Sequence, residues 1–193
     1  MKNRLKEYLF PLLITLLAVL LATLPPEITA PLMFQRDNIA AGEIWRAFSG
    51  HLLHLGWQHL LMNLAGLWMI FWFARGIVTV TEWLITLLFS SLLISLGLLL
   101  FSEITWYVGL SGLLHSLLAL VALRLIEHKH REGWIILLFL LCKIIWEQWQ
   151  GATPGLEQTI GGKVILEAHL YGAIAGLAIA ATLPLIKRIL QPH

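Results

Sequence analysis

The sequence predicts an all-α polytopic membrane protein, with six transmembrane helices in one bundle and with both termini in the cytoplasm. Two observations predict this class. The 193 residues are 59% hydrophobic and only 12% charged, whereas soluble domains contain about 25% charged residues. The apolar segments are also too long for core strands and lack the alternation of a membrane barrel. We therefore expect helical spans.

Six apolar segments have close to the ~20 residues that a helix needs to cross a bilayer. We place them at Tyr8–Leu24, Leu52–Ala74, Glu82–Phe101, Leu110–Ile126, Trp134–Gln150 and Ile165–Ile186. The connections between them are too short for a second domain, so residues 1–193 are expected to form a single membrane domain. The first segment follows basic residues, as in a signal peptide. Because no small-residue cleavage site follows it, we interpret it as a retained span.

The distribution of basic residues predicts the orientation, because positive charge concentrates on the cytoplasmic side of a membrane. With the N-terminus in the cytoplasm, the inner side carries Lys2, Arg4, Lys6, Arg75, Arg124, Lys129, Arg131, Lys187 and Arg188. The outer side then carries only Arg36, Arg46 and Lys163, and Lys143 lies within a span. In this orientation the fourth and sixth spans both begin at the outer side, so Ser111 and His169 near their starts lie at the same depth in the membrane.

The composition argues against several classes of site. The single cysteine, Cys142, excludes an internal disulfide and a metal site with several thiolates. The net charge is only +2 and the basic residues are dispersed, so the chain has no patch for binding nucleic acid. We expect no cofactor and no bound metal.

The fourth span begins with Gly109-Leu110-Ser111-Gly112, and small or polar residues continue along one face through His115 and Ser116. Such a stripe is often only a helix-packing surface. However, the flanking glycines allow another backbone to approach the serine closely, and a helix N-terminus presents free N–H groups to an anion. Ser111 is therefore a candidate nucleophile.

A candidate base lies in the sixth span, where Ala168, Gly172 and Gly176 recur every four residues and His169 borders the face they form. That face allows close packing, and packing against the fourth span would bring His169 beside Ser111. A histidine within the membrane is a functional candidate by default, although a lone one can be structural.

The second span adds His59 and Asn63, which are four residues apart and project from the same face of a helix. His54 would point about 140° away from His59 on a continuous helix. We expect His59 and Asn63 to act as a pair, and His51 and His54 to order the neighbouring loop.

These residue types fit peptide-bond hydrolysis. A serine needs an adjacent base, and the tetrahedral oxyanion needs hydrogen-bond donors, which His59, Asn63 and the Ser111 N–H could supply. The acidic residue nearest to His169 in sequence, Glu167, points about 160° away on a helix. A serine–histidine dyad without a carboxylate is therefore expected.

Lys143 and Glu147 are four residues apart in the fifth span, at an unusual depth for charged groups. One interpretation is a mutual ion pair whose outer end reaches the membrane surface. The other is a contact that gates substrate entry.

The sequence resembles the rhomboid family of intramembrane serine proteases. The resemblance covers nearly the whole chain and rests on four motifs in family order. They are Trp45-Arg46, His54-x₄-His59-x₃-Asn63, Gly109-x-Ser111-Gly112 and Ala168-His169-x₂-Gly172-x₃-Gly176. The compact chain and Leu114-His115 look like the rhombosortase subfamily.

The resemblance implies a rhomboid-like bundle in the bacterial inner membrane, with its active site opening toward the periplasm. Ser111 would be the nucleophile, His169 the general base, and His59, Asn63 and the Ser111 backbone the oxyanion hole. Gly109, Gly112, His115, Gly172 and Gly176 would contact substrate or pack the helices. Trp45, Arg46 and His54 would be structural. The substrate would be a membrane-anchored protein whose C-terminal tail has a glycine-rich motif, a membrane helix and a basic cluster.

Three positions depart from the family pattern. His115 stands where many rhomboids have a tyrosine that stacks on the catalytic histidine, which fits the subfamily. Ser116 replaces the glycine that the subfamily usually has next. Ala74-Arg75-Gly76 lacks the glutamate that many rhomboids carry near the inner end of the second span. The last two are expected to alter packing or stability.

Two other functions compete with protease activity. A catalytically inactive rhomboid-like protein could bind membrane clients, although such relatives lose the serine or the histidine. A helical bundle could bind a metal or haem through His54, His59, His115 and His169. A transporter is disfavoured because the sequence shows neither inverted repeats nor broken mid-span helices.

Overall fold

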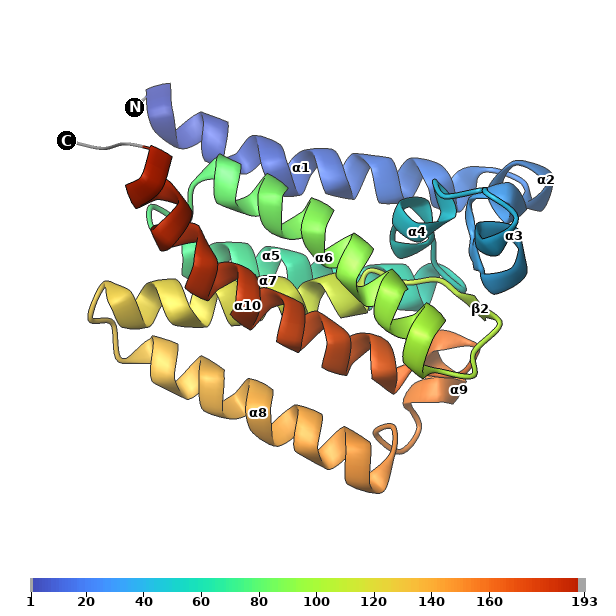
Figure 1. Cartoon of the computed structure of the whole chain (residues 1–193). Coiled ribbons are helices and arrows are strands. Elements are labelled where there is room, and N and C mark those ends of the chain that lie inside the picture. The colour runs from blue at the N-terminus through green and yellow to red at the C-terminus, as the bar shows by residue number, and fades with distance from the viewer. Residues whose placement is uncertain (1, 191–193) are drawn as a thin grey trace.

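The structure is a computed structural model that describes the backbone of residues 2–190 and the side chains of residues 7–183. Six long helices form the bundle (Figure 1). They are α1 (Lys2–Thr23), α5 (Trp57–Ala74), α6 (Val80–Phe101), α7 (Ser111–Glu127), α8 (Glu132–Gln150) and α10 (Leu166–Leu190). Each overlaps one of the six apolar segments in the sequence.

Short elements fill the connections. The loop between α1 and α5 contains α2 (Pro26–Thr29), η1 (Ala30–Leu32), β1 (Phe34–Gln35), α3 (Arg36–Ala40), α4 (Arg46–Ser49) and η2 (Gly50–Leu52). The remaining two are β2 (Trp106–Tyr107) and α9 (Leu156–Ile160). β1 pairs antiparallel with β2, with Phe34 opposite Tyr107. This pairing fixes the first loop to the chain just before Ser111.

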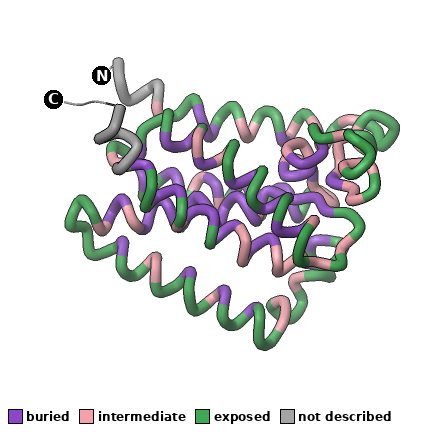
Figure 2. The backbone as a smooth tube through the Cα atoms, in the orientation of Figure 1, coloured by how far each residue is buried: buried purple, intermediate pink, exposed green. Residues whose placement is uncertain are grey.

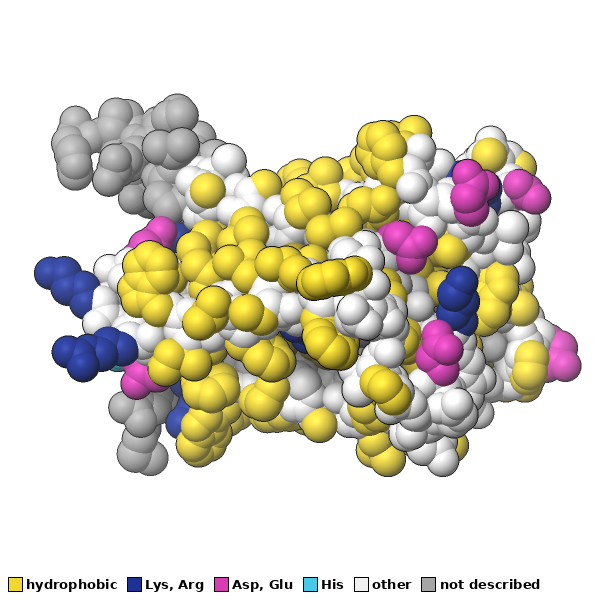
Figure 3. Space-filling model, turned by 90° about the horizontal axis from the view of Figure 1, so that it is seen from below, with side chains coloured by type: hydrophobic (Ala, Val, Ile, Leu, Met, Phe, Trp, Pro, Cys, Tyr) yellow, Lys and Arg dark blue, Asp and Glu magenta, His cyan; other side chains and the backbone are white. Residues whose placement is uncertain are grey.

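The surface and the helix lengths fit a membrane domain. Two described helices, Val80–Phe101 and Leu166–Leu183, are long and apolar enough to cross a membrane. The others are shorter or carry more polar side chains, so the count of six spans stays a prediction. On the face seen in Figure 3, hydrophobic side chains form a broad band between ends that carry the charged groups. α1 begins and α10 ends at the same end of the bundle (Figure 1).

α7 forms the centre of the bundle, where purple marks buried residues in Figure 2. Its buried residues include Leu113, Leu117, Leu120 and Val121, and it contacts α5, α6, α8 and α10. This explains why its side chains are mostly apolar outside the stripe of small and polar residues: a helix that is surrounded by others is apolar nearly all round. Ser111 at its first turn is therefore held by a well-packed element.

α10 packs against α7 through glycine, backbone to backbone. A Cβ atom added at Gly172 would overlap the carbonyl oxygen of Gly112, and one added at Gly176 would overlap that of Ser116. A Cβ added at Gly112 would lie 2.9 Å from the carbonyl oxygen of Ala168. The four-residue repeat therefore lies at the α7–α10 contact, as the small-residue pattern predicts.

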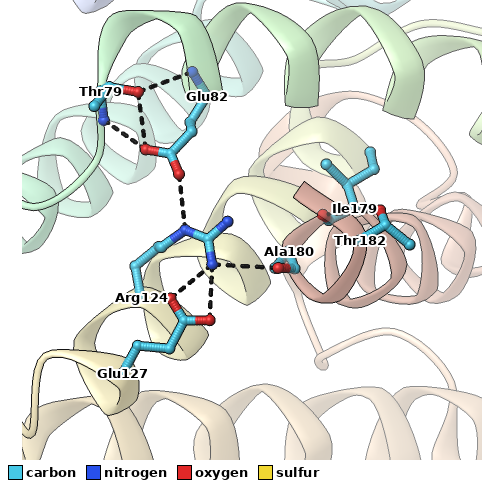
Figure 4. Close-up of polar contacts among 7 residues, drawn as sticks. All are labelled: Thr79, Glu82, Arg124, Glu127, Ile179, Ala180 and Thr182. Atoms are coloured by element: carbon cyan, nitrogen blue, oxygen red, sulfur yellow. Dashed lines mark hydrogen bonds and ion pairs between the residues drawn. The ribbon is translucent and has the colours of Figure 1, made fainter. Parts of the chain in front are cut away.

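At the opposite end from Ser111, a buried arginine joins three helices (Figure 4). Arg124 Nε donates to Glu82 Oε1 at 2.9 Å, and its Nη1 donates to Glu127 and to the carbonyl of Ala180. Glu82 also forms a capping box with Thr79 at the start of α6. Arg124 is 4% exposed, so its charge is paired inside the bundle and does not lie free at the inner side, where the prediction of the orientation counted it.

The same network bears on the missing glutamate in Ala74-Arg75-Gly76. A buried carboxylate at this end of the bundle comes from Glu82 on α6, and the part of α5 nearest to it ends at Ala74 without one. The side chains of Lys2, Arg4, Lys6, Lys187 and Arg188, which also entered the orientation, lie outside the described residues.

Trp45 and Arg46 brace the first loop. Arg46 forms an ion pair with Glu43 at 2.5 Å and donates to the carbonyls of Ala30 and Met33. The Trp45 indole N–H donates to the carbonyl of Pro31 at 3.0 Å. These bonds satisfy the backbone of an irregular segment that has few ladder partners of its own.

The chain between α4 and α5 corrects the predicted start of the second span. Leu52–Gly56 is a 3₁₀ turn and loop, and α5 begins only at Trp57. Gly56 is fully extended, with φ 179° and ψ −177°. His51, just before this loop, is buried, and its Nε2–H donates to Ser95 Oγ at 3.1 Å and to the Ser91 carbonyl at 3.2 Å. The imidazole thereby ties the loop to α6, and the loop geometry replaces the predicted helical turn.

We expect acid to weaken this tie. Burial lowers the pKa of His51 to about 4, whereas the pKa of a histidine in the unfolded chain is about 6.5. Below about pH 6.5 the unfolded chain binds a proton that the folded chain does not bind. The His51 contribution to stability is therefore full above about pH 6.5 and falls as the pH drops toward 4, reaching a loss of about 2 kcal/mol at pH 5.

Thermal unfolding in detergent micelles at pH 7.5 and pH 5 measures this effect. His51→Gln should have a smaller difference between the two pH values than the wild-type protein, because it lacks the titrating group. Equal differences in the two proteins would contradict the prediction.

Candidate active site

Ser111 and His169 come together where α7 and α10 begin. Ser111 Oγ lies 3.0 Å from His169 Nε2, and His169 is only 4% exposed. Ser111 is the first residue of α7, while His169 is in the first turn of α10. The glycine contact between these helices sets the distance between the two side chains. A hydroxyl and an imidazole at this distance have the geometry that a nucleophile and its base require.

A carboxylate also contacts His169, contrary to the expected dyad. Glu147 Oε2 on α8 lies 2.9 Å from His169 Nδ1, and Glu147 is 2% exposed. Glu167 has the orientation that the helix geometry predicts, because it accepts a hydrogen bond from Ser102 and not from His169. The expectation failed because it considered acidic residues close in sequence, whereas the partner comes from a different helix.

His115 covers one face of the His169 ring. The two rings are stacked, with centroids 4.1 Å apart and planes 16° apart. His115 Nδ1–H donates to the Ser111 carbonyl at 2.7 Å, which fixes the ring. His115 therefore has the stacked position that the resemblance assigns to a tyrosine, and its neighbour Ser116 bonds Ser90 Oγ on α6.

His59 and Asn63 lie on the buried face of α5. The backbone N–H of Leu55 donates to His59 Nδ1 at 3.3 Å, which leaves the Nε2–H of that ring as a donor. Among the described residues, no acceptor bonds the buried amide nitrogen of Asn63. Each of these two residues thus has a side-chain donor without a partner among the described residues, and the His59 ring lies next to Gly109.

Gly109 positions the His59 ring next to the serine loop. With φ +139°, Gly109 has a conformation that side chains disfavour. A Cβ atom there would lie 3.0 Å from His59 Cε1 and 3.8 Å from Ser111 Oγ. A side chain at this position would therefore occupy the space between the two functional groups.

His54 lies in the loop before α5 and not on the helix itself, so the predicted 140° separation does not apply. Its ring contacts the His59 ring edge to face, with centroids 5.1 Å apart. Neither ring nitrogen of His54 has a hydrogen-bond partner among the described residues. His54 packs against a donor of the site, whereas His51 bonds α6.

A cavity of about 310 Å³ lies between the β2 segment and the start of α10. It is lined by residues that directly precede the site in sequence, Val108 before Gly109 and Glu167 before Ala168-His169, together with Glu103 and Lys163. Its position beside both motifs makes it a candidate place for an extended peptide.

Sequence reasoning missed two residues of this site. The sequence did indicate that Glu147 needs a partner, because it is a charged residue at membrane depth, but the motif spacing does not identify His169 as that partner. No feature of the sequence indicates a role for Tyr107. Its buried hydroxyl donates to the Gly109 carbonyl at 2.5 Å, and so helps to hold the serine loop.

Three of these residues have potential metal ligand atoms within 4.8 Å of one another, namely His115, Glu147 and His169. However, both nitrogens of His169 already bond Glu147 and Ser111. The parallel stacking of the two imidazoles also directs their in-plane lone pairs side by side and not toward one point. The arrangement fits a hydrogen-bonded chain better than a metal centre.

Comparison with known proteins finds a family model and related sequences that match this chain. The family model described as Rhomboid domain matches residues 41–185, a range that contains Ser111, His169 and the residues around them. Proteins named rhomboid protease GlpG from Salmonella paratyphi A, Salmonella newport and Salmonella typhi are each 29% identical to this chain over 153 residues. That alignment covers 75% of this chain and 50% of each relative, so the chain spans about half the length of these relatives.

Proposed function

Because the chain belongs to the rhomboid family, we propose that it is an intramembrane serine endopeptidase with Ser111 as nucleophile and His169 as general base. The observation that carries the proposal is the 3.0 Å distance between Ser111 Oγ and His169 Nε2. In this family the domain is an integral membrane protein, which agrees with the apolar surface. The relatives that match it are named as rhomboid proteases.

The reaction follows from the positions of the two side chains. Ser111 Oγ attacks the scissile carbonyl carbon while its proton moves to His169 Nε2. As the C–N bond breaks, Nε2 gives this proton to the leaving amine, and an acyl-enzyme remains on Ser111. Water then attacks the acyl carbon and gives a proton to Nε2, which returns it to Ser111 Oγ as the acid product leaves.

The oxyanion of each tetrahedral intermediate needs donors aimed at it. His59 Nε2–H, the Asn63 amide and the Ser111 N–H are the candidates. The Asn63 amide supports this role, since a buried donor without a protein acceptor costs about 1–3 kcal/mol unless a ligand or transition state uses it. We therefore include His59 and Asn63 in the catalytic site.

Replacing Asn63 by alanine is expected to lower kcat by about 10²–10³-fold, because one donor to the oxyanion is lost. KM should change little if the bond forms only in the transition state. Steady-state cleavage in liposomes measures both constants. Gln58→Ala on the same helix is the control and should keep the wild-type kcat. An unchanged kcat for Asn63→Ala would remove Asn63 from the oxyanion hole.

For the substrate we propose a membrane-anchored protein with a glycine-rich tail, a membrane helix and a basic cluster, as in rhombosortases. Leu114-His115 and the stacking of His115 on His169 support this assignment. Glycine suits the cleavage region, because a helix must unwind before its peptide bond is attacked. The site would open toward the periplasm, in a single six-span domain with both termini in the cytoplasm of a bacterium.

The test is cleavage of a model protein carrying such a tail by the purified chain in liposomes. A matched substrate, in which leucines replace the glycines, separates the protease proposal from the tail preference. Two results together support protease function and the tail preference. The chain cleaves the glycine-tailed substrate but not the leucine one, and a fluorophosphonate that labels Ser111 blocks this cleavage. Equal cleavage of the two substrates would contradict the tail preference. Failure both to cleave and to be labelled would contradict protease function and favour a protein that binds membrane clients.

A further inference from the structure

We propose that Glu147 is a positioning residue that completes a serine–histidine–glutamate chain in this protein, an inference that rests on the proposed protease function. Its carboxylate, on the outermost helix of the site, orients His169 and balances the charge that His169 acquires during the reaction. α8 therefore contributes to the chemistry although neither Ser111 nor His169 belongs to it.

The geometry has the order of a catalytic triad. Ser111 Oγ, His169 Nε2, His169 Nδ1 and Glu147 Oε2 are joined by contacts of 3.0 Å and 2.9 Å on opposite sides of one imidazole ring. The three side chains come from α7, α10 and α8, which lie side by side in Figure 1. A triad is recognised by this geometry and not by sequence order or fold.

Glu147 also has its second oxygen occupied. Lys143 Nζ donates to Oε1, so the carboxylate has one partner on each oxygen. Glu147 is 2% exposed while the Lys143 side chain is 29% exposed, so the ammonium group lies between the buried carboxylate and the surface. A buried carboxylate needs such compensation to stay ionised. The ion pair expected from the sequence thus exists, and it leaves Oε2 free for His169.

The contact with Nδ1 determines which nitrogen of His169 accepts a proton. An ionised carboxylate accepts only, so Nδ1 must carry the hydrogen and donate it to Glu147. The lone pair is then on Nε2, which faces Ser111. When Nε2 takes the serine proton, the imidazolium lies next to a fixed negative charge. Glu147 gives up no proton in any step; it orients the ring and stabilises the cation.

The ion pair alone does not account for this arrangement. A lysine and a glutamate four residues apart on one helix can bond without involving another helix. Here the carboxylate reaches across to α10, to the nitrogen of His169 opposite Ser111. A purely structural pair has no requirement for that contact.

The experiment compares Glu147→Gln, Glu147→Asp and the wild-type protein in liposomes, with kcat, KM and the rate of fluorophosphonate labelling as readouts. Glutamine keeps the size but not the charge, and its amide can donate to Nδ1 and stabilise the wrong tautomer. We expect Glu147→Gln to lower kcat and the labelling rate together by about 10²-fold, with KM little changed. Glu147→Asp keeps the charge and should regain part of both rates.

Glu132→Gln is the matched control, because it removes a carboxylate from the same helix at the exposed opposite end. It should keep the wild-type rates. Thermal unfolding identifies a merely structural effect. In that case Glu147→Gln and Glu147→Asp would both lose stability, and kcat and the labelling rate would fall in proportion to the lost stability. That result, or a kcat of Glu147→Gln within about twofold of wild type, would overturn the proposal. If wild type itself neither cleaves nor labels, the proposed function fails instead.

Discussion

Alanine at position 111 is expected to reduce peptide-bond cleavage by about 10⁴–10⁶-fold, since no nucleophile remains for His169 to activate. The substitution removes one oxygen atom at the first residue of α7 and leaves the glycine contact with α10 unchanged. Substrate binding and thermal stability should therefore stay close to wild type. Cleavage in liposomes and covalent labelling by a fluorophosphonate measure the loss.

A second serine provides the control. Ser91 is buried in α6 and its hydroxyl donates to the Leu87 carbonyl of its own helix. Ser91→Ala should keep full activity. If Ser111→Ala keeps more than about one hundredth of the wild-type rate, Ser111 is not the nucleophile.

Valine at position 172 is expected to have the largest effect on stability. The first atom of the new side chain would lie 2.0 Å from the Gly112 carbonyl oxygen, far inside contact distance, so α10 must move away from α7. Overpacking in a dense core typically costs about 1–3 kcal/mol. We expect at least the upper end of that range here, because the clash is with backbone and not with a side chain that can rotate. The separation of Ser111 from His169 would grow, and activity should be lost at temperatures where the protein is still folded.

Ala178→Val is the matched control, because it adds a β-branched side chain to the exposed face of the same helix. It should change neither the unfolding temperature nor the cleavage rate. Thermal unfolding in micelles, together with cleavage assays at several temperatures, measures both variants. Equal stability of Gly172→Val and Ala178→Val would show that the helices do not need this close approach.

The sequence predicted the helices well, because their signal is local. The six apolar segments overlap six long helices, and the four-residue repeat of Ala168, Gly172 and Gly176 lies on the face that contacts α7. The start of the second span was wrong, since the tie of His51 to α6 and the extended Gly56 favour a loop there. Such a tie joins residues far apart in sequence, and no helical periodicity reveals it.

The site was predictable to the extent that its members belong to motifs. Ser111, His169, His59 and Asn63 were singled out from the sequence, and the structure brings Ser111 and His169 into hydrogen-bond contact. Glu147 and Tyr107 were not assigned to it. Their roles depend on which helices are neighbours, and in a bundle with apolar faces on all sides the sequence leaves that order open. Arg124 was misjudged for the same reason, because its partner Glu82 is on another helix.

The glycine contact between α7 and α10 has a consequence for how this protein can vary. The spacing of Ser111 and His169 is determined by main-chain atoms meeting main-chain atoms, so it does not depend on the identity of the large side chains around it. Exposed residues such as Leu138, Phe139 and Trp149 on α8 can therefore drift among apolar types as the surrounding lipid changes. Substitutions at the few glycine positions are the ones that selection must remove.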